Sequence, residues 1–389
     1  MTVKELTLES LYDDMVKWRR HLHQNPELSF HEFETSRMIA ELLEAWGLEV
    51  RRGVAGTGIV AKLRGGLPGR TIALRADIDA LSIQDVKDCS YRSQVSGVMH
   101  ACGHDGHTAQ LLAVARYYSL HRNETAGTRV FLFQPGEEVL PGGAIRMIED
   151  GALDGVDAIY GVHLWTPMPY GTAATRPGPF MATPDEFEIE IIGRGGHGGL
   201  PHESKDALVV GASLVVALQT IVARSVNPLD ATVLSVGKFA SGSANNVIAE
   251  SSRLSGTVRS FDKRVRAIVR KRLEEIVKHT CEMHGCEYRL AYFEGYPPVV
   301  NNEAEAGRVL RLIGEWFPES AGPCEPIMAG EDFSYYLEQK PGCFFFVGAG
   351  SDDGSSSPHH HPRFDIEEKA MLHSAKLLIA VADDSALDV

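Results

Sequence analysis

The stretch that decides the fold class is RVFLFQPGEE, residues 129–138 of this 389-residue chain. It is a short apolar run, typical of a buried strand, followed by a Pro-Gly turn and two adjacent carboxylates. The neighbouring segments alternate between the two kinds of element, with strands predicted at 71–74 and 158–162 and helices at 107–120 and 144–149. Strands that alternate with helices predict an α/β fold with a mainly parallel sheet covered on both faces.

The pattern changes near Pro184. From there the order is strand, helix, strand, strand, helix, strand, predicted at 186–192, 206–224, 232–236, 253–258, 262–284 and 286–292. This order is the split βαβ arrangement of a ferredoxin-like α+β domain. The alternating pattern resumes afterwards, with a helix at 303–316, a strand at 343–347 and a helix at 366–382. We therefore expect a catalytic domain, residues 1–183 and 295–389, interrupted by an inserted domain, residues 184–294.

Composition excludes several classes of protein. The net charge of -14 disfavours nucleic acid and anionic membrane as partners, because both require a basic surface. The N-terminus has no basic segment followed by an apolar run, and no apolar stretch reaches the roughly 20 residues that span a bilayer. The six cysteines are scattered without the spacing of a disulfide scaffold. These features predict a cytoplasmic protein whose partners are neither nucleic acid nor membrane.

The densest polar cluster is MHACGHDGH, residues 99–107, directly before an apolar helix. Cys102 and His104 are two residues apart, so that in an extended loop they point to the same side. A thiolate and an imidazole suit zinc and its neighbours among the divalent metals. The alternative is a polar loop that caps a helix and is rich in histidine by chance.

Three more donor clusters follow predicted strands. Hydrolysis at a metal centre needs one carboxylate as a ligand and another as general base, which Glu137 and Glu138 could supply, although paired glutamates are more often solvated charges. His163 follows an apolar strand and could equally be structural, and the tract His359-His360-His361 could be a surface loop. Because such loops gather at the carboxyl edge of an α/β sheet, the four clusters together predict a metal site there.

These motifs resemble the amidohydrolase branch of the M20 metallopeptidase family, which includes aminoacylases, hippurate hydrolases and plant auxin-conjugate hydrolases. The resemblance covers almost the whole chain. The matching segments are residues 19–23 with Pro26-Glu27, 75–81, 99–107, 134–138, 195–202, 245–248, 256–259, 330–333 and 360–364. The departures are Gly136 and Gly198-Gly199, where the family commonly has alanine, and Ser82, where it commonly has proline. None of them is a proposed ligand.

The resemblance implies a centre of two divalent metal ions, zinc or manganese or else cobalt. Its ligands would be Cys102, His104, Glu138, His163 and His360. Glu137 would be the general base, and Asp79 would orient a histidine ligand. Asp77 could act similarly or simply cap its strand.

The inserted domain contributes three further candidates through the same resemblance. His197 resembles a histidine that reaches the active site of a partner subunit and steadies the oxyanion, and Asn245 and Arg259 resemble substrate-binding positions. From the residues alone, they could be a turn histidine, a capping amide and half of a surface ion pair. The inserted domain would then serve as dimerisation and substrate-lid domain of a homodimer or higher homo-oligomer.

The predicted activity is hydrolysis of the amide bond of N-acyl amino acids. One alternative with the same chemistry is a dipeptidase or carboxypeptidase. Another is a non-catalytic protein that binds metal or acyl amino acids, which the Glu137-Glu138 pair disfavours because a closed structural site needs no free base. The sequence leaves the acyl group, the amino acid and the metal open.

Overall fold

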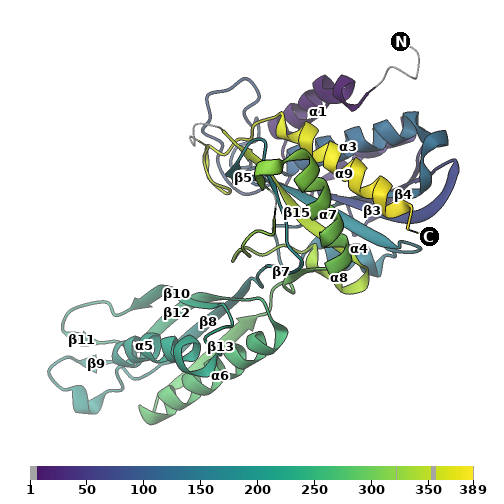
Figure 1. Cartoon of the computed structure of the whole chain (residues 1–389). Helices are drawn as coiled ribbons and strands as arrows, with labels where there is room; N and C mark the ends of the chain where they lie inside the picture. Colours follow the sequence, from purple (N-terminus) through teal and green to yellow (C-terminus); the bar gives the residue numbers. More distant parts are fainter. Residues whose placement is uncertain (1–6, 321, 352–355, 389) are drawn as a thin grey trace. The chain divides into compact units, whose positions relative to one another are not determined.

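The computed structural model describes residues 7–320, 322–351 and 356–388 (Figure 1). Contacts divide the chain into two compact units. The first comprises Met1–Gly178, Val300–Glu325 and Asp332–Val389, and the second comprises Pro179–Val299 with Pro326–Glu331. Each unit is built from a sheet and the helices that cover it.

The first unit contains a seven-stranded sheet with the order β1-β2-β4-β3-β5-β15-β6. Its strands are β1 (Glu49–Val54), β2 (Gly58–Arg64), β3 (Leu67–Asp77), β4 (Ala126–Gln134), β5 (Ala158–Pro169), β6 (Ala173–Ala174) and β15 (Gly342–Gly350). The four central strands β4, β3, β5 and β15 pair in parallel, whereas β1, β2 and β6 pair antiparallel at the edges. The carboxyl ends of the four parallel strands therefore meet at one edge.

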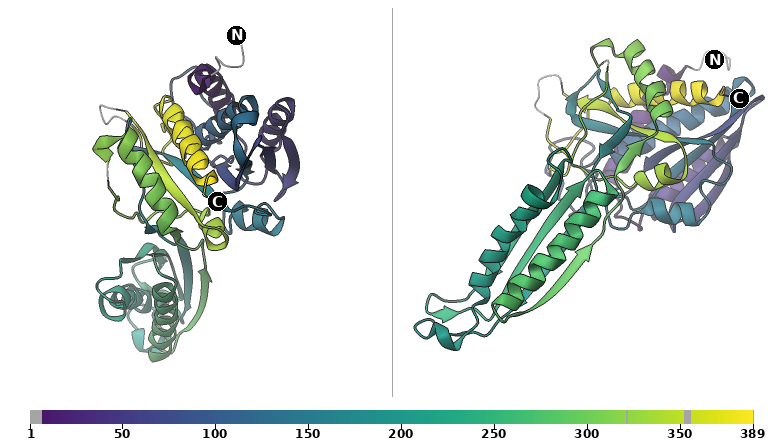
Figure 2. Two further views of the ribbon diagram at one scale, coloured as in Figure 1. Left: turned by 45° about the vertical axis from the view of Figure 1, so that its right-hand side comes forward. Right: turned by 60° about the horizontal axis from the view of Figure 1, so that its bottom comes forward.

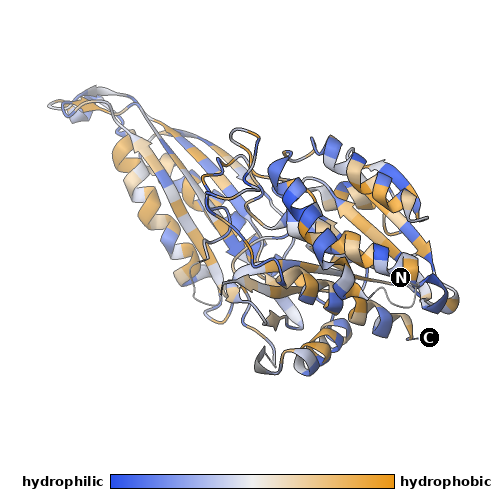
Figure 3. Cartoon of the chain, turned by 90° about the horizontal axis from the view of Figure 1, so that it is seen from above, coloured by the Kyte–Doolittle hydropathy of each residue, from blue (hydrophilic) through white to orange (hydrophobic). Residues whose placement is uncertain are grey.

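Helices cover both faces of this sheet. The main core includes side chains from α1 (Tyr12–Gln24), α2 (Phe33–Ala45), α3 (His104–Leu120), α7 (Glu303–Trp316) and α9 (Ala370–Ala386). Phe345 of β15 belongs to this core, so its neighbour Phe344 points to the opposite face. There Phe344 contacts the ring of Phe333, which precedes α8 (Ser334–Gln339), and α8 packs on α4 (Gly143–Glu149). Most of these helices carry both orange and blue segments in Figure 3, as expected of helices that pack by one face.

The second unit contains β8 (Asp185–Ile192), α5 (Ala207–Ser225), β10 (Thr232–Ser241), β12 (Ser251–Ser260), α6 (Lys263–Met283) and β13 (Glu287–Phe293). Its four-stranded antiparallel sheet has the order β10-β12-β8-β13. Asp206 and Asp262 cap the two helices by accepting backbone N–H bonds. The helices lie side by side (Figure 2), and their apolar faces share one core with the sheet. The predicted fold class, a mainly parallel α/β sheet with an inserted ferredoxin-like α+β domain, is confirmed.

Several predicted element bounds were too short. The strand predicted at 158–162 continues to Pro169, because β15 pairs with it along that length. The helix predicted from residue 107 already begins at His104. Its first residue follows Gly103, whose left-handed φ of 97° lets the chain turn into the helix at that point. Both differences matter, since they fix the backbone of His163 and His104.

Candidate metal centre

The predicted donor residues gather at the carboxyl edge of the large sheet. β3 ends at Asp77, and β4 ends at Gln134, shortly before Glu138. His163 belongs to β5, and the segment after β15 contributes His360. Four neighbouring parallel strands thus deliver polar side chains to one place, which is where open α/β sheets bind ligands.

The five predicted ligands all lie in the first unit and close together. Cys102 Sγ is 3.4 Å from His163 Nε2, and both lie within 4.8 Å of a ring nitrogen of His104. Glu138 Oε1 is 3.8 Å from His104 Nε2 and 3.4 Å from His360 Nε2. Cys102, Glu138 and His360 form a second set within 4.8 Å. The two sets share Cys102, so the geometry can accommodate more than one ion.

Two buried atoms in this cluster support metal binding directly. His104 Nε2 and Glu138 Oε1 are each buried without a hydrogen-bond partner among the described residues. An unsatisfied buried polar atom is costly, typically about 1–3 kcal/mol, and needs an explanation. A divalent cation accepts a lone pair from each of these atoms, so the donors fit a metal ion.

The orientation of His104 is fixed by Asp79. His104 Nδ1 donates to the Asp79 backbone oxygen at 3.0 Å and lies 3.1 Å from Asp79 Oδ1, which leaves Nε2 pointing into the cluster. Burial alone would lower the pKa of His104, but the charges of Asp77, Asp79 and Glu138 raise this pKa to about 10. The negative surroundings therefore favour a positive charge at Nε2, for which a proton and a metal ion compete.

The surroundings shift the pKa values of Cys102 and His163 in opposite directions. His163 Nδ1 donates to the Leu164 backbone oxygen at 2.9 Å, and burial, followed by His107 and His359, lowers the His163 pKa. His163 therefore stays neutral and keeps a lone pair on Nε2. Burial and the nearby carboxylates raise the pKa of the Cys102 thiol, so its thiolate form needs a cation beside it.

Asp77 bonds to a histidine that is not one of the five predicted ligands. Asp77 Oδ1 accepts a bond from His107 Nδ1 at 2.6 Å, and Asp77 Oδ2 accepts one from Arg75 at 2.6 Å. His107 Nε2 in turn accepts the Leu164 N–H at 2.9 Å. Both ring nitrogens of His107 are thus occupied, so this histidine supports the cluster and is not available as a ligand. Asp77 anchors it and also lies 3.7 Å from His104 Nε2.

Glu137 and Glu138, the two glutamates after β4, lie in different surroundings. Glu137 is buried, with 7% of its surface exposed. The backbone N–H of Glu138 donates to Asp79 Oδ2 at 3.1 Å. Asp79 therefore contacts both His104 and residues 135–138, which we call the glutamate loop. Neighbouring carboxylates in different settings can take different roles, as ligand and as base.

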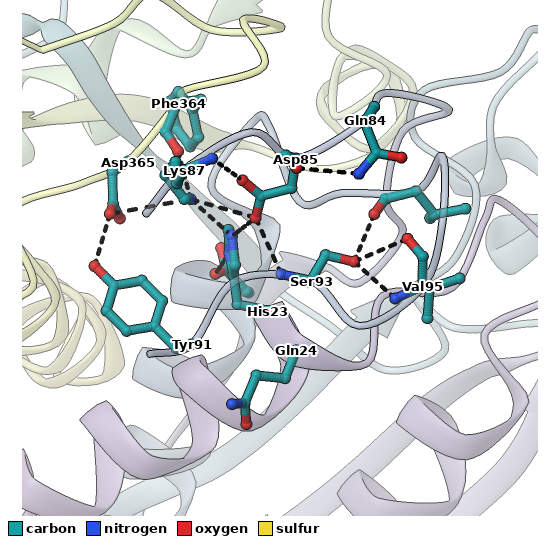
Figure 4. Close-up of polar contacts among 12 residues, drawn as sticks. His23, Gln24, Gln84, Asp85, Lys87, Tyr91, Ser93, Val95, Phe364 and Asp365 are labelled. Carbon is teal, nitrogen blue, oxygen red and sulfur yellow. Dashed lines mark hydrogen bonds and ion pairs between the residues drawn. The ribbon is translucent and has the colours of Figure 1, made fainter. Parts of the chain in front are cut away.

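The residues after His360 are bonded to a network around residues 84–96, part of which includes Phe364 (Figure 4). Val86 N–H donates to the Pro362 oxygen at 3.1 Å, and the buried Lys87 amine donates to the Phe364 oxygen at 2.7 Å. The same amine lies 2.8 Å from His23 Nε2. The segment that bears His360 is therefore fixed from outside the cluster, although His360 itself is half exposed.

The three candidates of the inserted unit are held differently. His197 is exposed, and its Nδ1 accepts the Gly199 N–H at 3.0 Å. Asn245 is also exposed and lies two residues before β11 (Val247–Ile248), which pairs with β9 (Gly196–His197). Arg259 is half-buried and donates to the backbone oxygens of Asp185 and Val258 at 3.3 and 3.1 Å.

The inserted unit does not bring these three side chains together. His197 and Asn245 lie beyond the end of the sheet where Ser251 pairs with Ile192, whereas Arg259 is eight residues further along β12. Eight extended residues span about 26 Å at roughly 3.3 Å each. A small substrate cannot contact both ends of this strand within one unit.

Some contributors to the site were missed by the sequence reasoning. They are His359, 3.8 Å from Cys102 Sγ, Ser29, bonded to Asp79 at 2.7 Å, and Glu32, bonded to Gly136 N–H at 3.0 Å. Nothing in the spacing of residues 28–33 indicates contact with residues 50 and 104 positions away. Only His359 had a signal, its place in the histidine tract.

Known proteins resemble this chain over most of its length. Residues 73–384 match the family described as peptidase family M20/M25/M40. An N-acyl-L-amino acid amidohydrolase of Geobacillus stearothermophilus is 46% identical over 77% of this chain and 82% of the relative. Thermostable carboxypeptidase 2 of Saccharolobus solfataricus is 38% identical over 94% and 93%. A crystallised dinuclear metal-binding peptidase of the M20 family from Bacillus subtilis has a TM-score of 0.83 at 31% identity, covering 98% of this chain and 99% of that one.

Proposed function

Since the chain belongs to peptidase family M20/M25/M40, we propose that it is a metal-dependent amidohydrolase of N-acyl amino acids. The products would be a carboxylic acid and a free amino acid. The observation that carries the proposal is the pair of buried, unsatisfied donor atoms, His104 Nε2 and Glu138 Oε1, next to a second glutamate. The similarity to an N-acyl-L-amino acid amidohydrolase supports the choice of substrate class.

We propose that two divalent cations per subunit, zinc or manganese, are the cofactor. Cys102, His104, Glu138, His163 and His360 would hold them. When bound, such ions polarise the scissile carbonyl and lower the pKa of water from about 16 to about 7. The dinuclear site of the structurally similar peptidase supports the number of ions.

The side chains of this chain then have separate tasks. Glu137 accepts the proton of the attacking water and later passes it to the leaving amine, as a general base and then a general acid. Asp79 keeps the Nδ1–H tautomer of His104 and holds the Glu138 backbone, so that both keep their direction during turnover. The buried setting strengthens these interactions, because water competes poorly there.

We further propose that the protein acts as a homodimer in which His197 serves the site of the partner subunit. The large separation of His197 from Arg259 along β12 supports this arrangement. His197 would donate to the oxyanion that forms on the amide carbonyl. Asn245 would assist His197 at the partner's site, whereas Arg259 would bind the substrate carboxylate at the site of its own subunit.

Helix α5 provides a surface for such a dimer. No charged residue occurs between Asp206 and Arg224, and Leu208, Val209 and Val216 are 43%, 49% and 71% exposed. This helix packs on the edge strand β10, whose outer backbone can pair with a second copy.

Among the described residues, α5 alone is also long and apolar enough to cross a membrane. This is weak evidence for a membrane span, because the other face of the helix packs on the sheet. We propose that the protein is cytoplasmic, which its six free cysteines support.

The decisive experiment uses metal-stripped protein with and without zinc or manganese. Amine release is measured from hippurate, N-acetylmethionine and a dipeptide, with Glu137→Gln as control. Metal-restored cleavage of an N-acyl amino acid that is absent in the control supports the proposal. Faster cleavage of the dipeptide favours the second candidate, a peptidase, which the similarity to a carboxypeptidase supports. Bound metal without any cleavage refutes both.

A further inference from the structure

The segment between α1 and α2 contacts the loops that carry the candidate chemistry. Leu28 forms a β-bridge with Ala80, and the Ala80 N–H donates to the Glu27 oxygen at 2.8 Å. Ser29 Oγ donates to Asp79 Oδ2 at 2.7 Å. That same oxygen accepts the Glu138 N–H, so the segment reaches the glutamate loop through a single carboxylate.

Glu32 reaches this loop directly. Its side chain is completely buried, and its Oε1 accepts the N–H groups of Phe30 at 2.8 Å and Gly136 at 3.0 Å. Its Oε2 accepts the Thr57 hydroxyl at 2.5 Å. Gly136 immediately precedes Glu137, so this carboxylate holds the peptide unit from which the proposed base extends.

Phe30 constrains the other side of the same turn. Gly136 has a left-handed φ of 62°, and a Cβ at this position would lie 2.4 Å from a ring carbon of Phe30. The ring is itself covered by the Arg146 guanidinium, 4.3 Å from its centre. Phe30 also has a left-handed φ of 62°, which is uncommon for a bulky residue, and the Glu32 carboxylate accepts its N–H. The turn before Glu137 is thus fixed by a hydrogen bond and by packing against the same short segment.

We infer that Glu32 is a positioning residue for Glu137: by accepting the Gly136 N–H it sets the direction from which the Glu137 carboxylate meets water and substrate. This inference rests on the proposed function of Glu137 as base. Glu32 touches no donor of the metal cluster in the contacts described above, so its removal disturbs proton transfer and leaves the metal in place. A displacement of about 1 Å in a catalytic group can cost 10²-fold in rate.

The test is Glu32→Leu, which removes both acceptor oxygens and so the bond that the Gly136 N–H donates to Glu32. We expect kcat to fall about 10- to 100-fold, with KM and metal content unchanged. Glu27→Leu is the matched control from the same segment. Glu27 accepts the N–H groups of Glu34 and Thr35 at 3.1 and 2.8 Å, where α2 begins, so its loss should lower the melting temperature and leave kcat unchanged.

A double-mutant cycle separates positioning from general damage. If Glu32 acts only through Glu137, Glu32→Leu should cost no further activity in a Glu137→Gln background, whereas independent effects multiply. Gly136→Ala supplies a second variant in case Glu32→Leu does not fold, and it should show the same loss of kcat because the new methyl group displaces Phe30 from the turn. Equal kcat in wild type and Glu32→Leu overturns the inference, as do multiplicative effects or loss of metal. If instead metal-loaded wild type cleaves none of the amides, the proposed function itself has failed.

Discussion

The two groups of predicted site residues differ in how the fold holds them. In the first unit, His104 is buried, its Nδ1 bonds to Asp79, and its Nε2 has no hydrogen-bond partner among the residues that the structure describes. In the inserted unit, the His197 side chain is exposed, and its Nδ1 accepts the N–H of Gly199, two residues away. In the first group, bonds to neighbouring residues fix the directions of the donor atoms, which converge on one place. His197 and Arg259 of the second group bond to neighbouring groups of their own unit, so a catalytic role for them would require a substrate or a second subunit that binds there.

The largest expected effect tests the first group at its centre. Glu137→Gln removes the proton acceptor but keeps the shape of the side chain, so kcat should fall about 10²- to 10⁴-fold. Metal content, measured by elemental analysis, should remain that of the wild type, because the five candidate ligands are unchanged. Near-wild-type turnover in this variant would remove Glu137 from the mechanism.

Much of this first group was predictable, because it depends on local signals. Apolar runs that end in Pro-Gly or in polar residues mark strand ends, and the carboxyl ends of parallel strands must meet. The thiol, imidazole and carboxylate donors of the four clusters therefore predicted a common site. The alternation of elements predicted the fold class for the same reason, since it depends on periodicity along the chain.

The remainder depended on contacts between distant segments. The sequence does not indicate that both nitrogens of His107 are occupied, by Asp77 and by the Leu164 N–H. It gives no sign of Glu32 bonding to Gly136, 104 residues away, or of the left-handed backbone at Phe30. Such contacts are set by how elements pack, and packing leaves no periodic pattern in a single sequence.

The next effect tests whether the second group needs a second subunit. His197→Ala should lower kcat about 10²- to 10³-fold, the typical loss for one oxyanion donor, with metal content unchanged. Mixing it with Glu137→Gln under subunit exchange should restore activity. In a mixed dimer one of the two sites would combine an intact Glu137 with the partner's intact His197. Since half of the dimers in an equal random mixture are mixed, the mixture should show roughly a quarter of wild-type activity. Absence of restored activity, with mixed dimers demonstrated, would mean that His197 acts within its own chain.

A smaller effect measures how strongly the first group depends on its supports. Asp79→Asn weakens the bond that fixes the His104 tautomer and direction. Metal affinity should fall about 10- to 100-fold, measured by competition with a chromogenic chelator. Asp150→Asn is a suitable control, since the Asp150 carboxylate accepts the Ala55 N–H at 2.7 Å instead. Equal affinities in the two variants would show that His104 keeps its orientation without the Asp79 carboxylate.

The smallest effect concerns Arg259, whose guanidinium bonds backbone oxygens of its own unit and must give up some of these bonds to grip a substrate. A charge-assisted hydrogen bond contributes about 1.5–3 kcal/mol, and part of this offsets the bonds that are exchanged. Arg259→Met should therefore raise KM only about tenfold, with kcat nearly unchanged. The specific readout compares an N-acyl amino acid with the analogue whose carboxylate is an amide. Wild type should prefer the carboxylate and the variant should lose this preference, because only a fork of N–H donors distinguishes the two. Equal preference in both proteins would leave Arg259 with the structural role that its present bonds already describe.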